Sequence, residues 1–312
     1  MKTNIHQITL KSFEHYGHRV PPDNLSNVLK FVRPLVRQSI MMAYQGRSAT
    51  YGRQPSWLAA ASDIRFIDVT GDEDTILHFE APVLGEAADV FYRQQEFWPS
   101  KPSPEETGFD LLSGVVNDVS AGNQNSDRFD LQLLERVAGF GKVCEKPFAE
   151  IAIDGPRNHT MAQPIVLFNH AQQLRAETPD PQRVRVVGKL DMIRRSNDNF
   201  ALRLDDGQEI RGVITQGTVA DLRFLFDQRV VVTGYAIYRP SGYLLRVDAE
   251  NVFSGEGESS FWSTIPLPRR EDIDVTKIRN RQDKKVGAAA IFGQWPGDEN
   301  EEDLLRGLRE LG

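Results

Sequence analysis

Few residues of this sequence have the types and spacing that catalysis needs. His15 and His18 would share one face of a helix, but a metal site takes three or four ligands, and no acidic residues stand beside them at ligand spacing. Cys144 has Lys142 and Lys146 nearby, which would favour a thiolate, yet a lone cysteine after an apolar helix is typical of a packing residue. Phosphate-loop, nucleophile-elbow and zinc-helix motifs are absent from the sequence. We therefore predict no catalytic residue, metal site or cofactor, and favour a function other than that of an enzyme.

Arginine and aromatic residues occur together in the segment 183–253. Bases stacked on aromatic rings beside arginines are how small barrels hold single-stranded nucleic acid. The candidate nucleic-acid-binding residues are Arg185, Phe200, Tyr235, Tyr238, Arg239 and Arg246. The segment has eleven basic and nine acidic side chains, a net charge of +2, so any such binding should be weak. In the alternative interpretation, the aromatic residues fill or cover the barrel.

The C-terminal tail combines large apolar residues with strong charge. Residues 269–285 carry a net charge of +3, and residues 298–312 carry −4. Asp298 is placed to cap a helix with an acidic first turn, but a lone helix of about thirteen residues is marginal in water. We expect it to dock on its own first domain or in a groove of a partner protein. The candidate partner-binding residues are Trp262, Phe292, Trp295, Leu304, Leu305, Arg306, Leu308 and Arg309.

The tail also resembles that of a known family. The run Phe261–Pro266, a charged spacer, and the run Ile291–Glu302 before a Leu-rich segment resemble the end of small bacterial antitoxins paired with PIN-domain ribonuclease toxins. The resemblance covers about fifty of the 312 residues. It implies that the tail wraps the toxin and that Arg306 or Arg309 reaches its acidic metal-binding site. Such antitoxins are shorter and begin with a DNA-binding module, which we do not recognise here.

The rest of the chain, including Val187–Arg194 and Val232–Gly234, resembles uncharacterised bacterial proteins. Its first part is expected to mix helices and strands. Apolar spacing predicts helices at about 24–45, 105–121 and 127–140, and strands at about 63–69, 75–79 and 148–153. Asp23 or Asn24 is placed to cap the first helix, and Pro34 should kink it or divide it in two.

The second part is expected to be a β-barrel. Strands at about 183–193, 200–204 and 208–214, a short helix at 219–226, and strands at 229–238 and 243–252 follow in the order of an oligonucleotide- or oligosaccharide-binding (OB-like) barrel. Asp205–Gly207 and Arg239–Gly242 mark two hairpin turns. The sequence thus predicts an α+β chain with a mixed domain at 1–180, an OB-like barrel at 181–253, a linker at 254–297 and an amphipathic helix at 298–312.

Composition limits the function further. The chain has 312 residues, 40% of them hydrophobic, a net charge of −7 and a pI near 5.5, which argues against binding long nucleic acid by bulk charge. One cysteine, no leader-like start and no long apolar run indicate a cytoplasmic protein without a membrane partner. We expect an antitoxin-like protein that binds a partner, such as a PIN-domain toxin, through its tail. The alternative is a binder of single-stranded nucleic acid or nucleotides acting through the barrel, and a third class is an enzyme without a readable signature.

Overall fold

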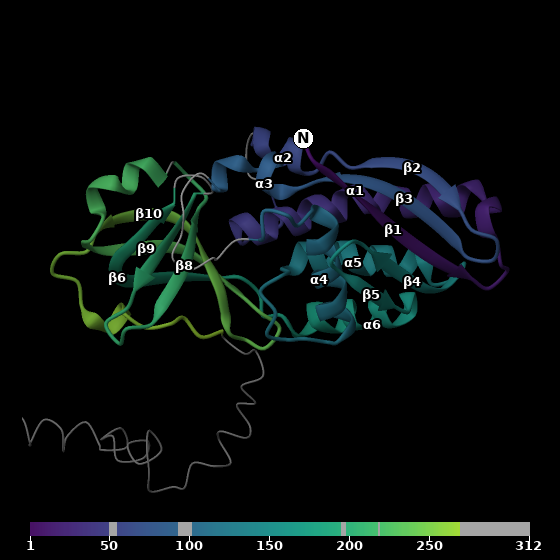
Figure 1. Ribbon diagram of the computed structural model, residues 1–312. Coiled ribbons are helices and arrows are strands. Elements are labelled where there is room, and N and C mark those ends of the chain that lie inside the picture. The colour runs from purple at the N-terminus through teal and green to yellow at the C-terminus, as the bar shows by residue number, and fades with distance from the viewer. Residues whose placement is uncertain (50–54, 93–101, 195–197, 218, 269–312) are drawn as a thin grey trace, which may run out of the picture. The chain divides into compact units, whose positions relative to one another are not determined.

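The computed structural model describes residues 1–49, 55–92, 102–194, 198–217 and 219–268. The described chain contains helices, strands and a closed five-stranded barrel (Figure 1), which confirms the α+β class and the barrel. The expected helix at 298–312 lies outside the described residues. So do seven of the expected partner-binding residues: Phe292, Trp295, Leu304, Leu305, Arg306, Leu308 and Arg309.

The first part of the chain is built on an antiparallel sheet with the strand order β2-β3-β1-β4-β5. Its strands are β1 (Thr3–Ser12), β2 (Arg65–Thr70), β3 (Thr75–Pro82), β4 (Phe148–Asp154) and β5 (His159–Ala162). Alternate residues of β1 point into the core, and these are His6, Ile8, Leu10 and Ser12. The predicted hairpin and the strand near 148 are confirmed, whereas the central strand β1 was not predicted.

Four longer helices pack against the buried face of this sheet (Figure 1). They are α1 (Pro22–Gln45), α4 (Gly108–Ser120), α5 (Leu131–Cys144) and α6 (Pro164–Glu177), and the shorter helices are α2 (Ser56–Ala61), α3 (Leu84–Ala87), η1 (Gly17–Arg19) and η2 (Asp89–Phe91). Cys144 is fully buried in their core, and burial raises the pKa of its thiol. This burial agrees with the packing interpretation.

Helix α1 differs from the prediction at its start and at its proline. No side chain caps it; it begins with Pro22 in the first turn, where the missing N–H is not needed. The helix also runs through Pro34 as one element, so it is not divided in two. Val32, Leu35 and Val36 are buried on either side of that proline, and this packing offsets the one backbone hydrogen bond that proline removes.

The barrel comprises β6 (Gln182–Arg194), β7 (Asn199–Arg203), β8 (Glu209–Ile214), β9 (Arg229–Tyr238) and β10 (Leu244–Ser254). Its strands close in the order β10-β8-β7-β6-β9, and the β8–β10 pair is parallel while the others are antiparallel. Between β8 and β9 the expected helix is a 3-10 helix, η3 (Val219–Leu225). Both predicted turns are present, and Gly207 and Gly242 have positive φ angles of 84° and 85°.

Residues Met1–Pro268 form one compact unit, because the barrel packs on the first part of the chain. Leu245 and Ile237 of the barrel join the hydrophobic core of the first part. Part of the expected linker also packs on the barrel: η4 (Ser260–Trp262) is followed by the buried Ser263, whose hydroxyl accepts a hydrogen bond from the Asp205 N–H at 2.9 Å.

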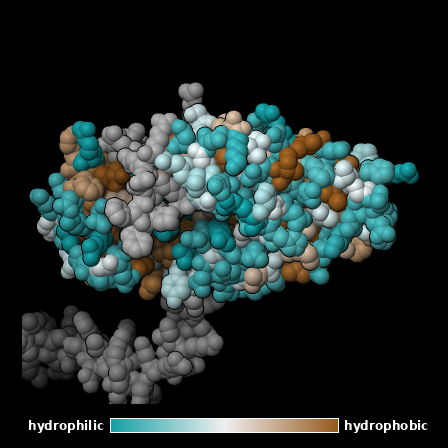
Figure 2. Space-filling model, viewed as in Figure 1, coloured by the Kyte–Doolittle hydropathy of each residue, from teal (hydrophilic) through white to brown (hydrophobic). Residues whose placement is uncertain are grey.

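The surface of the described chain is mostly polar on the face that Figure 2 shows. Separate hydrophobic patches lie on this face, and the exposed hydrophobic residues of the chain include Phe66 and Ile67 on β2. Among the described helices, none combines the length and the apolar character of a membrane span.

Candidate functional site

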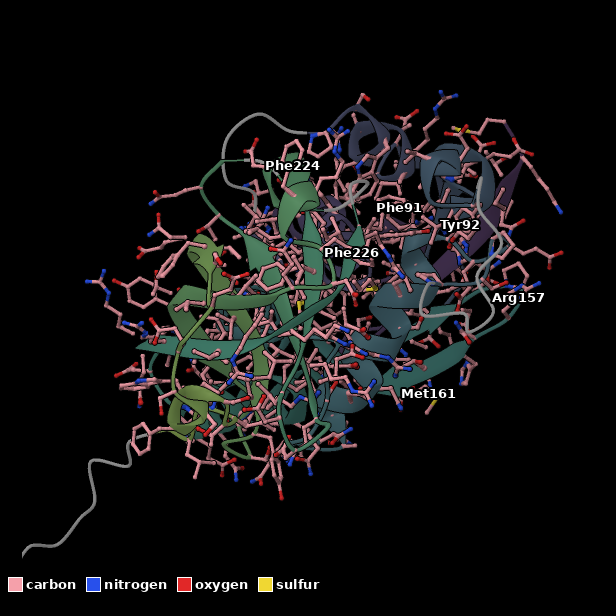
Figure 3. The ribbon with its side chains drawn as sticks, turned by 90° about the vertical axis from the view of Figure 1, so that its left-hand side faces the viewer. Phe91, Tyr92, Arg157, Met161, Phe224 and Phe226 are labelled. Atoms are coloured by element: carbon pink, nitrogen blue, oxygen red, sulfur yellow. The ribbon has the colours of Figure 1, made fainter. Side chains whose placement is uncertain are left out.

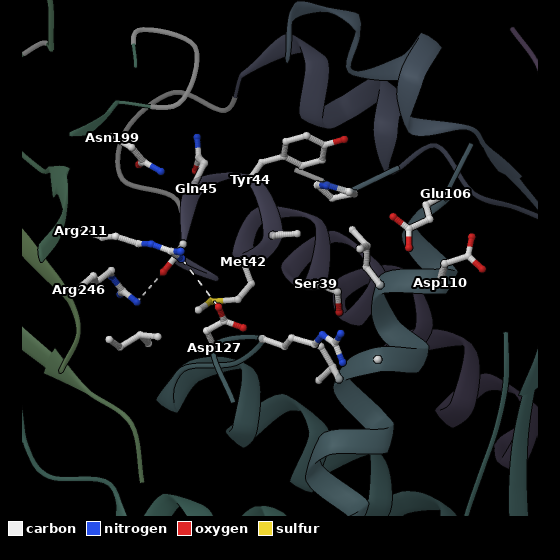
Figure 4. A pocket seen from close by; sticks show the side chains of 18 of the residues that line it. Ser39, Met42, Tyr44, Gln45, Glu106, Asp110, Asp127, Asn199, Arg211 and Arg246 are labelled. Carbon is white, nitrogen blue, oxygen red and sulfur yellow. Dashed lines mark hydrogen bonds and ion pairs between the residues drawn. The ribbon is translucent and has the colours of Figure 1, made fainter. Parts of the chain in front are cut away.

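A cavity of about 770 Å³ lies where the barrel meets the first part of the chain (Figure 4). On the barrel side it is lined by β6, β7, β8 and the start of β10; on the other side it is lined by the end of α1, the start of α4, the α4–α5 loop and β5. Its volume falls within the range of about 300–1,000 Å³ that is usual for small-molecule sites.

The register of the barrel strands fixes the wall on the barrel side. Arg194 of β6 pairs with Asn199 of β7, and Asn199 pairs with Val213 of β8. Because side chains alternate along a strand, Glu209 and Arg211 share the outward face of β8 with Val213. These five side chains therefore project from the barrel toward the first part of the chain.

Arg246 is the buried cation of this wall. Its side chain is 8% exposed and donates to the Asp248 carboxylate through Nε at 2.7 Å and Nη2 at 3.4 Å. Its Nη1 donates to the Gly46 carbonyl at 2.8 Å, at the C-terminus of α1, where the helix dipole favours a cation. Nη1 also lies 3.5 Å from the Asp130 carboxylate. Arg246 thus ties the barrel to α1 and α5.

Asp130 joins this cluster to the first part of the chain. It is the N-cap of α5 and accepts a hydrogen bond from the Leu133 N–H at 3.2 Å. The Ser48 N–H and hydroxyl also donate to its two carboxylate oxygens. The predicted helix at 127–140 therefore begins later, at Leu131, because the cap is Asp130.

The opposite wall of the cavity is acidic and begins at α4. Thr107 caps this helix in a reciprocal capping box with Asp110, whose Oδ2 accepts from the Thr107 N–H at 2.8 Å. The other oxygen, Oδ1, accepts from Asn158 Nδ2 at 3.1 Å. Glu106 comes directly before the N-cap Thr107 and accepts a hydrogen bond from the Ser103 N–H. Both carboxylates line the cavity (Figure 4).

A buried histidine supports this acidic wall. His6 Nε2 lies 2.9 Å from Thr107 Oγ1, and the His6 ring stacks on Phe109 at 5.0 Å between centroids. Burial lowers the pKa of His6, although the nearby charge of Asp110 acts in the opposite direction. The neutral imidazole thus holds the capping box from behind the cavity wall.

Aromatic residues position the end of α1 at the cavity. Tyr44 lines the cavity and stacks on Phe91 at 4.5 Å, with Trp57 at 5.5 Å. Its hydroxyl hydrogen-bonds to that of Tyr92 at 2.5 Å, and Tyr92 in turn donates to the Pro102 carbonyl at 2.9 Å. Burial raises the pKa of both phenols, that of Tyr92 to about 12, so these hydroxyls stay protonated at neutral pH.

A second histidine lies on the cavity surface. His159 of β5 pairs in register with Asp154 of β4, and its Nδ1 contacts the Asp154 carboxylate. This contact orients the ring, with the imidazole held by a carboxylate on the neighbouring strand.

The structure separates the residues proposed for nucleic-acid binding. Phe200 and Tyr238 are 1% and 2% exposed, so they are core residues and offer no open ring face for base stacking. Arg185 is paired with Glu258, and Arg239 donates to the Asn125 carbonyl at 3.0 Å. The remaining two are Arg246, which is buried in the cluster described above, and Tyr235, which is 40% exposed. Of the six residues, Phe200 and Arg246 line the cavity.

Trp262 is the expected partner-binding residue that the structure describes. It is 42% exposed and lies edge-on to Phe261, which is 73% exposed. Two other exposed aromatic residues of the barrel unit, Phe224 and Phe226, belong to the segment around η3 (Figure 3), and neither lines the cavity.

The histidines near the N-terminus are not joined in a cluster. His18 Nδ1 lies 3.3 Å from the Gly71 carbonyl, which is a contact of a surface loop. Within the part of the chain that the structure describes, no group of three or more His, Cys, Asp or Glu side chains is arranged to hold a metal ion.

For most residues of the cavity, no pattern in the sequence indicates that they lie together in one site. Thr107 and Asp110 fit a capping-box pattern, which predicts the start of a helix and no binding site. Arg211 and Asp127 form an ion pair of 3.8 Å across the cavity, although 84 positions separate them in the sequence. Comparison with protein-family models, curated proteins and solved structures finds no match to this chain.

Proposed function

We propose that this chain is a binding protein that holds a nucleotide, or the end of a single-stranded nucleic acid, in the cavity beside the barrel. The observation that carries the proposal is the position of the cavity on the outward face of β7 and β8. The barrel order, with β8 parallel to β10, supports an OB-like barrel, and such barrels bind oligonucleotides and oligosaccharides on the face of their second and third strands.

Two features favour a short ligand over a long strand. The turn between the fourth and fifth strands of an OB-like barrel borders its binding groove, and here it contacts the chain itself. The Ser241 N–H donates to the Gln124 carbonyl at 3.1 Å, and Arg239 donates to Asn125 in the same loop. The cavity walls also carry balanced charges, without the cationic excess that polynucleotides require.

Calorimetry with mononucleotides and short oligonucleotides tests this proposal. Arg211 is 70% exposed and lines the cavity, so Arg211→Glu should weaken nucleotide binding by about tenfold to a hundredfold through loss of a charge-assisted hydrogen bond. Arg183→Glu is the matched control, because Arg183 is an exposed arginine of the same barrel outside the cavity. Equal effects of the two variants, or no nucleotide binding by the intact chain, would contradict the proposal.

A second candidate function is binding of a partner protein, such as a PIN-domain ribonuclease, through the C-terminal tail. The antitoxin-like sequence pattern supports it. So does the exposure of Phe261 and Trp262 just before the tail, because exposed aromatic residues are common anchors of protein interfaces. In this proposal the tail inhibits the partner, with Arg306 and Arg309 as contacts to its acidic site.

Co-purification and RNA cleavage with the product of the neighbouring gene test the second candidate. The intact chain should bind and inhibit that protein, whereas a chain ending at Lys285 should do neither. Exchange of Arg306 and Arg309 for Glu should release the nuclease activity. Equal inhibition by the intact and shortened chains would contradict the proposal.

A further inference from the structure

The charged residues of the cavity are divided between its two walls. The barrel contributes three arginines and one acid, and the first part of the chain contributes one arginine and three acids. The barrel residues are Arg194, Arg211, Arg246 and Glu209, and the others are Arg128, Glu106, Asp110 and Asp127. Figure 4 shows Arg211 and Arg246 on one side and Glu106 and Asp110 on the other. A ligand that spans the cavity would meet cations at one end and carboxylates at the other.

On the cationic wall, one arginine is held only weakly by its carboxylate partner, so a ligand anion could take that partner's place. Arg246 is enclosed by two carboxylates and a carbonyl, so its charge is already compensated. Arg211 instead faces Asp127 at 3.8 Å, and both side chains are more than half exposed. An exposed pair at this distance contributes little free energy, so a ligand anion could replace Asp127 beside Arg211.

The carboxylates of the acidic wall are held in fixed positions, where they can accept hydrogen bonds from a ligand. Asp110 is 4% exposed, and its two oxygens are positioned by Thr107 and Asn158. Glu106 is positioned by the Ser103 N–H. Ionised carboxylates only accept hydrogen bonds, so this wall repels a phosphate and favours a group that carries N–H donors.

We propose that the cavity selects nucleotides whose base carries an exocyclic amino group, with the phosphate beside Arg211 and the amino group beside Glu106 and Asp110. This inference rests on the proposed nucleotide-binding function. Carboxylate side chains read the amino group of cytosine in the same way in nucleic-acid recognition. The 4-amino group of cytosine donates, whereas the 4-keto oxygen of uracil would meet the carboxylates as a second acceptor.

Calorimetry of the full chain with cytidine and uridine monophosphate tests the inference, because the two ligands share their phosphate and ribose. We expect cytidine monophosphate to bind at least about ten times more tightly. Glu106→Gln should remove most of this preference, because the amide can donate to the uracil oxygen as well as accept. Glu105→Gln should leave it unchanged, since Glu105 is exposed, pairs with Arg157 and does not line the cavity.

The outcomes separate this inference from the function on which it rests. Equal binding of both nucleotides, or a preference that survives Glu106→Gln, overturns the inference and leaves nucleotide binding intact. Binding of neither nucleotide overturns both. Glu106→Gln keeps an oxygen to accept from the Ser103 N–H, so an unchanged thermal midpoint should show that a lost preference reflects recognition and not unfolding.

Discussion

At the scale of single residues, a substitution of Arg246 best tests which contacts hold the barrel to the rest of the chain. Arg246→Met would leave the buried carboxylates of Asp130 and Asp248 without their cation. We expect the free energy of unfolding to fall by about 3–5 kcal/mol, as for other broken buried ion pairs. Urea denaturation of the variant measures this loss.

The matched control for that prediction is Arg183→Met. Arg183 is 74% exposed and lies 3.8 Å from Glu250, so its removal should change the free energy of unfolding by less than about 1 kcal/mol. If the two variants were destabilised equally, the Arg246 cluster would not be a buried structural contact.

His6 gives a prediction about acid stability. Burial lowers the pKa of His6 in the folded state, so the unfolded chain takes up the proton at a higher pH, near the ordinary value of 6.5. The contribution of His6 to stability is therefore complete above that pH and decreases as the pH falls through the folded-state pKa. His6→Gln should show a smaller loss of unfolding free energy between about pH 7.5 and pH 5 than the unmodified chain.

Equilibrium unfolding at several pH values measures that difference. His18→Gln is the control, because His18 is an exposed histidine of the short helix η1. An acid-induced loss of stability that is the same in the His6 variant and the unmodified chain would show that another group causes it.

At the scale of elements, the turn between β7 and β8 depends on one glycine. Gly207 has a φ of 84°, and a Cβ at this position would meet no atom within 4 Å, so only backbone strain opposes substitution. Gly207→Val should lower the free energy of unfolding by about 1 kcal/mol or more. Gly207→Asn should cost less, because Asn tolerates a positive φ. Thermal denaturation that ranks Asn as the worse substitution would contradict the assignment of strain.

The barrel was predictable from the sequence because its signals are local. Its strands alternate β-branched and polar residues, and Gly207 and Gly242 mark two of its turns. The central strand β1 was missed because its buried face includes His6 and Ser12, which do not give an alternating apolar pattern. Helix α6 was missed because its apolar residues do not form one stripe; Ile165 is 46% exposed.

The cavity could not be predicted because its walls come from distant parts of the chain. Nothing near Glu106 in the sequence indicates that it lines the same cavity as Arg211, since this requires the packing of the barrel on the first part of the chain. The same packing accounts for the burial of Phe200, Tyr238 and Arg246, of which Phe200 and Arg246 line the cavity. Their types suit nucleic-acid binding, but closure of the barrel and its contact with the first part of the chain bury them.

At the scale of the whole molecule, the barrel and the first part of the chain share both apolar and charged contacts. Leu245 lies in the core of the first part, and Arg246 beside it bonds to the end of α1. The turn at Ser241 adds a backbone hydrogen bond to the α4–α5 loop. If either part unfolded alone, it would expose Leu245 to water and leave the Arg246 cluster incomplete, at a cost of several kcal/mol.

We therefore expect residues 1–268 to unfold in one cooperative step. Hydrogen exchange with mass spectrometry, performed on the full chain in increasing urea, should give the same unfolding midpoint for peptides from β8 and β9 as for peptides from α4 and α5. In Arg246→Met the shared contact is weakened, so the two groups of peptides should lose protection at different urea concentrations. Separate transitions in the unmodified chain would contradict this, because they would show that the barrel is stable without its contact to α1 and α5. A single transition in both proteins would instead show that apolar contacts such as that of Leu245 are sufficient to couple the two parts.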